Sequence, residues 1–143
     1  MNDAGFEKVT QTDTAMYGPR RLLVCGFSAE AQPKFLTVLK MADMADIPVV
    51  WAMAGQKDQR LGTLLALDGG HGRGEASDLP RAIIVSGIME KQLHRLMDIC
   101  RKTGMKGALW AALTPTSEKW TLSSLLHELS AERTQLANRK SAQ

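Results

Sequence analysis

The sequence has no long apolar run. Its longest apolar stretches, such as residues 22–27, fall far short of the roughly 20 residues that a membrane-spanning helix needs. Residues 1–18 are polar and lack the apolar core of a signal peptide. Only two cysteines are present, Cys25 and Cys100, and both fall within apolar patterns, as reduced structural cysteines usually do. We therefore expect a cytoplasmic protein that does not enter a membrane.

Aromatic residues are also few, at 5% of the chain. The predicted strands carry only Phe27, Trp51 and Trp110, whereas RNA-binding sheets of the RRM type interleave aromatic residues along their strands. A net charge of +3 is a small excess of base. We expect no nucleic-acid partner and keep an RNA-binding module only as a second alternative. The matched positions of Trp51 and Trp110 in the two halves of the chain instead favour a shared core or a dimer face.

The sequence also lacks any constellation typical of catalysis or metal binding. Cys25 has no histidine at a related spacing, because His94 and His127 lie among polar neighbours on predicted helices. His71 has no second ligand nearby. The turn that begins at Gly26 lacks the second and third glycines of a dinucleotide-binding loop. We predict no catalytic residue, no metal site and no cofactor.

What the sequence does contain is the pattern of one α/β domain. Its 143 residues, 44% of them hydrophobic, are enough to bury a core. Four segments are apolar at both odd and even positions, which predicts strands covered on both faces. These segments are residues 22–27, 49–53, 82–88 and 108–113.

Helical spacing of apolar residues follows each predicted strand. The predicted helices lie near residues 32–42, 61–67, 90–103 and 121–132. The sequence thus predicts a β-α-β-α-β-α-β-α order and a four-stranded, mostly parallel sheet with flanking helices. We place a flexible arm at 1–18, the domain at 19–132 and a flexible tail at 133–143. Within the domain, halves 19–67 and 81–132 are joined by a glycine-rich loop, 68–80.

An internal repeat relates the two halves at an offset of 61 residues. Residues 23–27 then align with residues 84–88, and Gly26 falls on Gly87. Two pseudo-repeated β-α-β halves follow from this match. A ferredoxin-like α+β sheet is the alternative, although the short helix near residues 61–67 counts against it, because that fold joins its middle strands directly.

Part of the second half resembles a known family. A strand ending at Gly87 is followed by residues 111–117, Ala-Ala-Leu-Thr-Pro-Thr-Ser, then by Trp120 and by residues 125–129, Leu-Leu-His-Glu-Leu. This arrangement is similar to the bacterial domain of unknown function 3783, whose pattern is Ala-x-Leu-Thr-Pro-Thr-Asn…Trp…Leu-Leu-x-Glu. Ser117 stands where that pattern has asparagine. The resemblance covers residues 81–132 and implies no activity, because the family is uncharacterised.

A candidate ligand site follows from the expected sheet. If the strands are mostly parallel, the segments after three of them converge at one edge, where open α/β sheets bind ligands. The candidate ligand-binding residues are Gly26, Ser28, Gly87, Thr114, Thr116 and Ser117. Their hydroxyls, beside helix N-termini, would suit a phosphate or another anion. The structural alternative is that the hydroxyls cap and turn the chain into the last helix.

The function favoured by these patterns is a non-catalytic ligand-binding, regulatory or interaction module, with a homodimer or another protein partner left open. The alternative is a small enzyme that holds a phosphate- or carboxylate-bearing substrate on the loop 114–117. Hydroxyls pointing into a pocket would support the enzyme, and hydroxyls turned back onto backbone amides would count against it.

Overall fold

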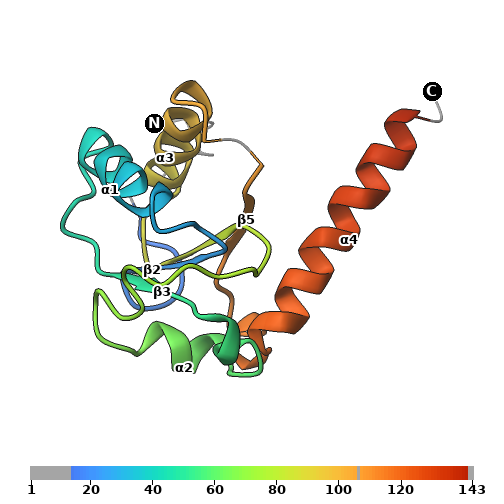
Figure 1. The fold of residues 1–143 in the computed structure, drawn as a ribbon, viewed down its shortest axis with the longest axis horizontal. Helices are drawn as coiled ribbons and strands as arrows, with labels where there is room; N and C mark the ends of the chain where they lie inside the picture. Colours follow the sequence, from blue (N-terminus) through green and yellow to red (C-terminus); the bar gives the residue numbers. More distant parts are fainter. Residues whose placement is uncertain (1–13, 106, 142–143) are drawn as a thin grey trace, which may run out of the picture.

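A computed structural model of the protein describes residues 14–105 and 107–141. Strands and helices alternate as the sequence predicts, with two added 3-10 turns (Figure 1). The first half contains β2 (Arg21–Cys25), α1 (Ala31–Met41), β3 (Val49–Trp51), η2 (Ala54–Gln56) and α2 (Leu61–Leu65). The second half contains β4 (Ala82–Ser86), α3 (Glu90–Lys102), β5 (Leu109–Ala112), η3 (Ser117–Lys119) and α4 (Leu122–Ser141).

The four strands form one mixed, mostly parallel sheet in the order β3-β2-β4-β5. Strands β2 and β3 run parallel, as do β4 and β5, and the two pairs meet antiparallel at β2 and β4. The predicted α/β class is confirmed. The ferredoxin-like alternative is wrong, because in that fold the two strands of each half are split apart, whereas here they are neighbours.

The strand registers repeat at the offset of 61 residues. Leu23 pairs with Val50 in the first half, and Ile84 pairs with Ala111 in the second. Leu23 and Ile84 themselves lie opposite each other in the central antiparallel pair. The two halves therefore have the same strand geometry and face each other around this pair.

Both faces of the sheet are covered, which explains why its strands are apolar at every position. On one face, Leu22 and Val24 pack with the residues of α1 and α3. On the other, Leu23 and Cys25 pack with α2 and with the first turns of α4. Figure 1 shows α1 and α3 on one side of the sheet and α2 on the other, giving three layers.

The last helix is longer than the sequence predicts. The helical pattern predicts an end near Glu132, but α4 continues to Ser141 and extends away from the rest of the domain (Figure 1). The Arg133 guanidinium holds this helix to the loop before β5 by donating to the carbonyl oxygens of Gly107 and Ala108, at 2.9 and 2.8 Å. None of the helices in the described residues is long and apolar enough to cross a membrane.

The expected flexible arm falls largely outside the structure, since residues 1–13 are not described. The described part of this arm is bound to the domain: Met16 donates its N–H to the Ile88 carbonyl at 2.9 Å, and Gly87 donates to the Tyr17 carbonyl at 3.0 Å. The chain is therefore held in place from residue 16, ahead of the predicted boundary at residue 19.

Candidate functional site

The structure divides the six predicted ligand-binding residues between two ends of the sheet. Gly26 and Ser28 follow β2, whereas Gly87 follows β4 and Thr114 follows β5. Because β2 runs antiparallel to β4, the segments that follow these two strands lie at opposite ends of the sheet. The expectation that they converge is wrong. The physical reason is that an apolar strand pattern shows that both faces are covered but not which way the strand runs.

The two glycines close the sheet at those opposite ends. Gly26 and Gly87 have φ angles of 75° and 66°, in the left-handed region that favours glycine. A Cβ at Gly26 would overlap the Leu79 carbonyl oxygen, and one at Gly87 would overlap the Gly18 carbonyl oxygen. Their conformation and close backbone contacts account for both glycines without a ligand.

Three of the four predicted hydroxyls make local bonds to backbone amides. Ser28 Oγ accepts from the Ala31 N–H at 3.2 Å, before α1. Ser117 Oγ accepts from the Thr114 N–H at 3.0 Å, and Thr114 Oγ1 accepts from the Ser117 N–H at 2.9 Å. Thr116, between them, is exposed. This reciprocal pair is the capping arrangement, which counts against the enzyme alternative.

The two cysteine thiols are poorly suited to act as nucleophiles. Cys25 and Cys100 are buried, and burial raises the pKa of the Cys25 thiol to about 12 and that of Cys100 to about 11. A thiol protonated at neutral pH is a poor nucleophile. The Nε2 atom of His71 lies 2.9 Å from the Nε2 atom of Gln56, within hydrogen-bond distance. Across the part of the chain that the structure describes, no group of three or more potential metal ligands comes together.

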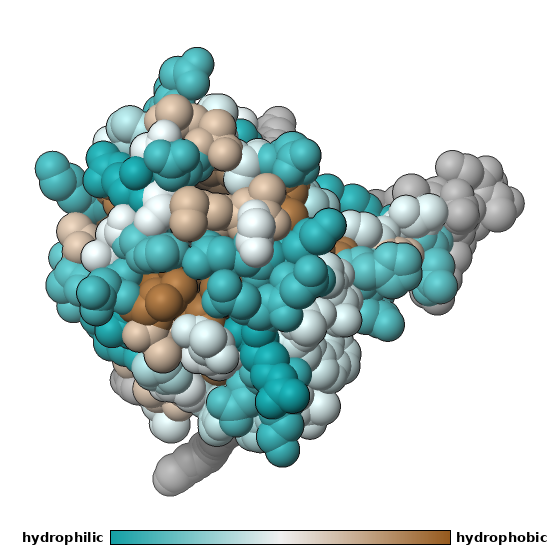
Figure 2. Space-filling view, turned by 60° about the horizontal axis from the view of Figure 1, so that its bottom comes forward, coloured by the Kyte–Doolittle hydropathy of each residue, from teal (hydrophilic) through white to brown (hydrophobic). Residues whose placement is uncertain are grey.

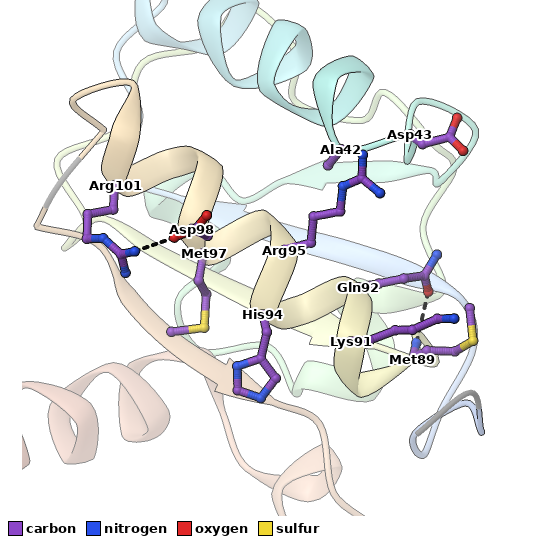
Figure 3. A pocket seen from close by; sticks show the side chains of 10 residues that line it. All are labelled: Ala42, Asp43, Met89, Lys91, Gln92, His94, Arg95, Met97, Asp98 and Arg101. Carbon is purple, nitrogen blue, oxygen red and sulfur yellow. Dashed lines mark hydrogen bonds and ion pairs between the residues drawn. The ribbon is translucent and has the colours of Figure 1, made fainter. Parts of the chain in front are cut away.

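A hollow of about 790 Å³ follows the outer surface of α3 (Figure 3). Its lining carries charges of both signs, and Asp98 pairs with Arg101. Figure 3 shows Arg95 reaching toward Ala42 at the end of α1, while His94 points away from it on the other side of α3. The polar groups therefore diverge around the helix, whereas a small-molecule site needs convergent ones.

The three strand aromatics occupy different environments. Phe27 and Trp51 are buried and pack edge to face at a centroid distance of 6.3 Å. Neither ring can stack on a nucleotide base, because helices cover that face of the sheet. Trp110 is half-buried on β5, at the end of the sheet. All three rings therefore contribute to the core on this face of the sheet, with Phe27 and Trp51 inside it and Trp110 at its margin.

The two edges of the sheet differ. At β3, the glycine-rich loop lies along the strand: the Gly70 N–H donates to the Val49 carbonyl and the Trp51 N–H donates to the His71 carbonyl, both at 2.8 Å. The buried Gln32 amide fastens the same loop, accepting from the Gly74 N–H at 2.7 Å. The structure thus places this loop as a cover over the outer edge of β3.

Within residues 14–105 and 107–141, no segment covers the edge at β5 in this way. The N–H groups of Leu109 and Leu113 donate to the carbonyl oxygens of Arg81 and Val85, at 2.9 Å each. Alternate residues of β5 therefore direct their backbone N–H and carbonyl groups toward β4. Trp110 and Ala112 lie between them and direct their N–H and carbonyl groups outward. Among the described residues, none makes a hydrogen bond to these outward groups. We call the outward backbone groups of Trp110 and Ala112 the β5 edge.

The β5 edge is bordered by a hollow on the α3 side of the sheet. This hollow, of about 460 Å³, is mainly apolar and is lined by Met97, Cys100, Arg101, Met105, Gly107, Ala108 and Trp110. On the face that Figure 2 shows, hydrophilic residues dominate and apolar residues gather in small separate areas. The β5 edge therefore combines unpaired backbone groups with neighbouring apolar surface.

The fold and this edge define the class: a three-layer α/β domain whose mixed sheet is covered at one edge and, as far as the described residues extend, open at the other. Residues 81–136 match a family described as Domain of unknown function (DUF3783). The predicted resemblance is confirmed. No curated protein and no solved structure matches the chain.

The family segment begins at β4 and includes β5 and most of α4. Its characteristic residues build the connection from β5 to α4. Thr114 and Ser117 cap the turn, Leu125 and Leu126 are buried against the sheet, and Glu128 is exposed. In this chain the motif therefore has a clear structural role, whereas the β5 edge, in the same segment, has no hydrogen-bond partner among the described residues.

Proposed function

We propose that the chain is a non-catalytic, cytoplasmic protein-interaction module that accepts an extended strand at the β5 edge. Strand addition uses the backbone groups of a sheet edge for affinity and neighbouring pockets for side-chain selectivity. The single observation that carries the proposal is the outward pair of backbone groups at Trp110 and Ala112. The hollow beside Trp110 offers an apolar place for a side chain of the added strand.

The comparison with β3 supports the proposal. Natural sheets usually protect their edges with loops, charged residues or proline. Here a loop protects β3, while β5 consists of Leu109, Trp110, Ala111 and Ala112, with neither charge nor proline. An edge left open in this way is suited to pairing with another strand.

Selection from a library of displayed random peptides tests the proposal, because the library samples many strand sequences at once. We expect the selected peptides to slow hydrogen exchange at the backbone amides of Trp110 and Ala112. Ala112→Pro removes one outward donor and should weaken peptide binding about threefold to tenfold. Ala112→Ser keeps the donor and is the matched control, with unchanged binding expected.

The location of binding decides the result. Peptides that protect only the surface of α3, or that bind the Ala112→Pro protein as tightly as the native chain, would overturn the proposal. Proline is tolerated on an edge strand when its missing N–H faces outward, so the variant should fold. A far-ultraviolet circular dichroism spectrum and a thermal melt of each variant establish that it does.

A further inference from the structure

We infer that the strand added at the β5 edge is β5 of a second copy of this chain, running antiparallel across a twofold axis at Ala111. This inference rests on the proposed strand-accepting function and names the partner. The result would be one continuous sheet of two chains in the order β3-β2-β4-β5, then the second copy's β5-β4-β2-β3.

The backbone groups fit this arrangement. In antiparallel pairs, the residues of a hydrogen-bonded pair exchange both of their backbone bonds, and alternate residues form non-hydrogen-bonded pairs. Placing Trp110 opposite the second copy's Ala112 makes a hydrogen-bonded pair, and the twofold axis generates the equivalent pair. Every outward donor and acceptor of the β5 edge then has a partner. Ala111 faces its own equivalent on the axis.

A twofold interface must be self-complementary, because one patch meets its own copy. The β5 edge meets this condition since its two outward residues contribute equal numbers of donors and acceptors, spaced symmetrically about Ala111. The molecule already contains such a pairing within itself, where Leu23 of β2 faces Ile84 of β4. The same antiparallel geometry would be repeated between chains.

The side chains at the axis permit close approach. Ala111 and Ala112 are small, and residues opposite each other in a non-hydrogen-bonded pair have Cα atoms only about 4.5 Å apart. Two of the cations near this edge have partners within the chain: Arg133 donates to the Gly107 and Ala108 carbonyls, and Arg101 pairs with Asp98. Like-charge repulsion from these two residues is thereby reduced.

Two short strands alone bury less than the roughly 1,200 Å² that a stable interface needs. The apolar hollow on the α3 side and the extended helix α4 on the other side can supply the remainder. Leu136 of α4 is 54% exposed, although it is a large apolar side chain. The twofold axis would place the two α4 helices on the same face of the joined sheet.

The covered edge at β3 limits the assembly to two chains. Since the glycine-rich loop already bonds to Val49 and Trp51, a joined sheet would end in covered strands on both sides. Closed twofold dimers are the commonest soluble homo-oligomers, and an interface that closes cannot propagate into fibres. This is why a second copy fits the edge as a stable partner.

A disulfide on the axis tests the register directly. Ala111→Cys would place two thiols opposite each other in a non-hydrogen-bonded pair, within the Cα separation that a disulfide accepts. We expect this variant of the full-length chain to form a covalent dimer under mild oxidation. Met41→Cys, at a residue 52% exposed on α1, is the control and should not crosslink comparably. The native Cys25 and Cys100 are buried and should not interfere.

Sedimentation equilibrium of the full-length chain gives the second measurement. We expect a dimer of 15.6 kDa chains, with at least a tenfold weaker association for Ala112→Pro and for Trp110→Lys. Met41→Lys should dimerise as the native chain does. The crosslink keeps the inference testable if either edge variant unfolds.

The outcomes separate the inference from the proposed function. A chain that stays monomeric at all concentrations, yet whose β5 edge is protected by displayed peptides, keeps the strand-accepting function and overturns the second copy as partner. A dimer that survives Ala112→Pro and fails to crosslink through Ala111→Cys would use another surface, and would also overturn the inference. If the native chain shows neither protection of the β5 edge by peptides nor dimer formation, the proposed function and the inference are both overturned.

Discussion

Gly26 and Gly87 occupy equivalent places in the two halves, and each lies against the chain segment that leads into the other half's first strand. Gly26 contacts residues 79–81, just before β4, and Gly87 contacts residues 18–20, just before β2. These contacted segments are also related by the offset of 61 residues, and each contains Pro-Arg. Each half thus packs closely against the other at one end of the central strand pair β2–β4.

Replacing either glycine should disrupt this backbone contact and destabilise the fold. Gly26→Ala and Gly87→Ala would each put a Cβ onto a carbonyl oxygen at a positive φ, so we expect a loss of more than about 2 kcal/mol of unfolding free energy. Gly55→Ala is the control, because nothing lies near its added Cβ, and its effect should stay within about 0.5 kcal/mol. Urea denaturation measures the difference. Equal stabilities for all three variants would contradict the close backbone contact.

The reciprocal cap at Thr114 and Ser117 should contribute to stability. Ser117→Ala removes the oxygen that accepts the Thr114 N–H, and we expect it to cost about 1 kcal/mol. Thr116→Val alters an exposed side chain of the same turn and should change the stability by less than about 0.5 kcal/mol. Chemical denaturation of the two variants makes the comparison. A larger effect at Thr116 would show that the cap has been assigned to the wrong hydroxyl.

Burial of Cys25 should make the stability fall in alkaline solution. Its pKa is raised from 9.0 to about 12, so the folded chain holds the thiol proton where the unfolded chain releases it. The free energy of unfolding should therefore decrease as the pH rises above about 9, by at most about 1.4 kcal/mol per pH unit from this group. Other groups also titrate in this range, so the measurement is the difference in slope between the native chain and Cys25→Ala. Identical slopes would contradict the prediction.

The strands were predictable because their apolar residues occur at both odd and even positions, as Leu22 and Leu23 illustrate. The direction of β4 was not, since the loop from Asp68 to Pro80 permits either orientation and the apolar pattern is the same in both. The β5 edge was also hidden. Hydropathy reports what lies above and below a strand, whereas Trp110 and Ala112 differ from buried strand residues in what lies beside them.

One sequence signal could have pointed to that edge. The first half has a glycine-rich segment after its second strand, and this segment becomes the cover of β3. The residues at the matching offset in the second half, 129–135, lie within α4 and contain no glycine. A repeat in which one half lacks a covering segment leaves its own outer strand uncovered.

Disturbing the cover of β3 should change how the chain assembles. Gly72→Ala would place a Cβ onto the Trp51 carbonyl oxygen at a φ of 76°, so we expect the loop to leave the edge. The sheet would then have two open edges, and light scattering after gel filtration should show species larger than a dimer. Gly74→Ala has a similar φ of 90° but no atom near the added Cβ, which makes it the matched control. Larger species in both variants, or in neither, would contradict a covering role for Gly72.

The central place of β4 also bears on the family segment. Residues 81–136 contain only β4 and β5 of the four strands, and β4 needs β2 on its other side to complete its hydrogen bonds. The matched segment is therefore half of a folding unit, and its first residue does not mark a place where the chain could be cut. Expressed without its N-terminal half, it would have to borrow a complementary strand from another molecule or remain unfolded.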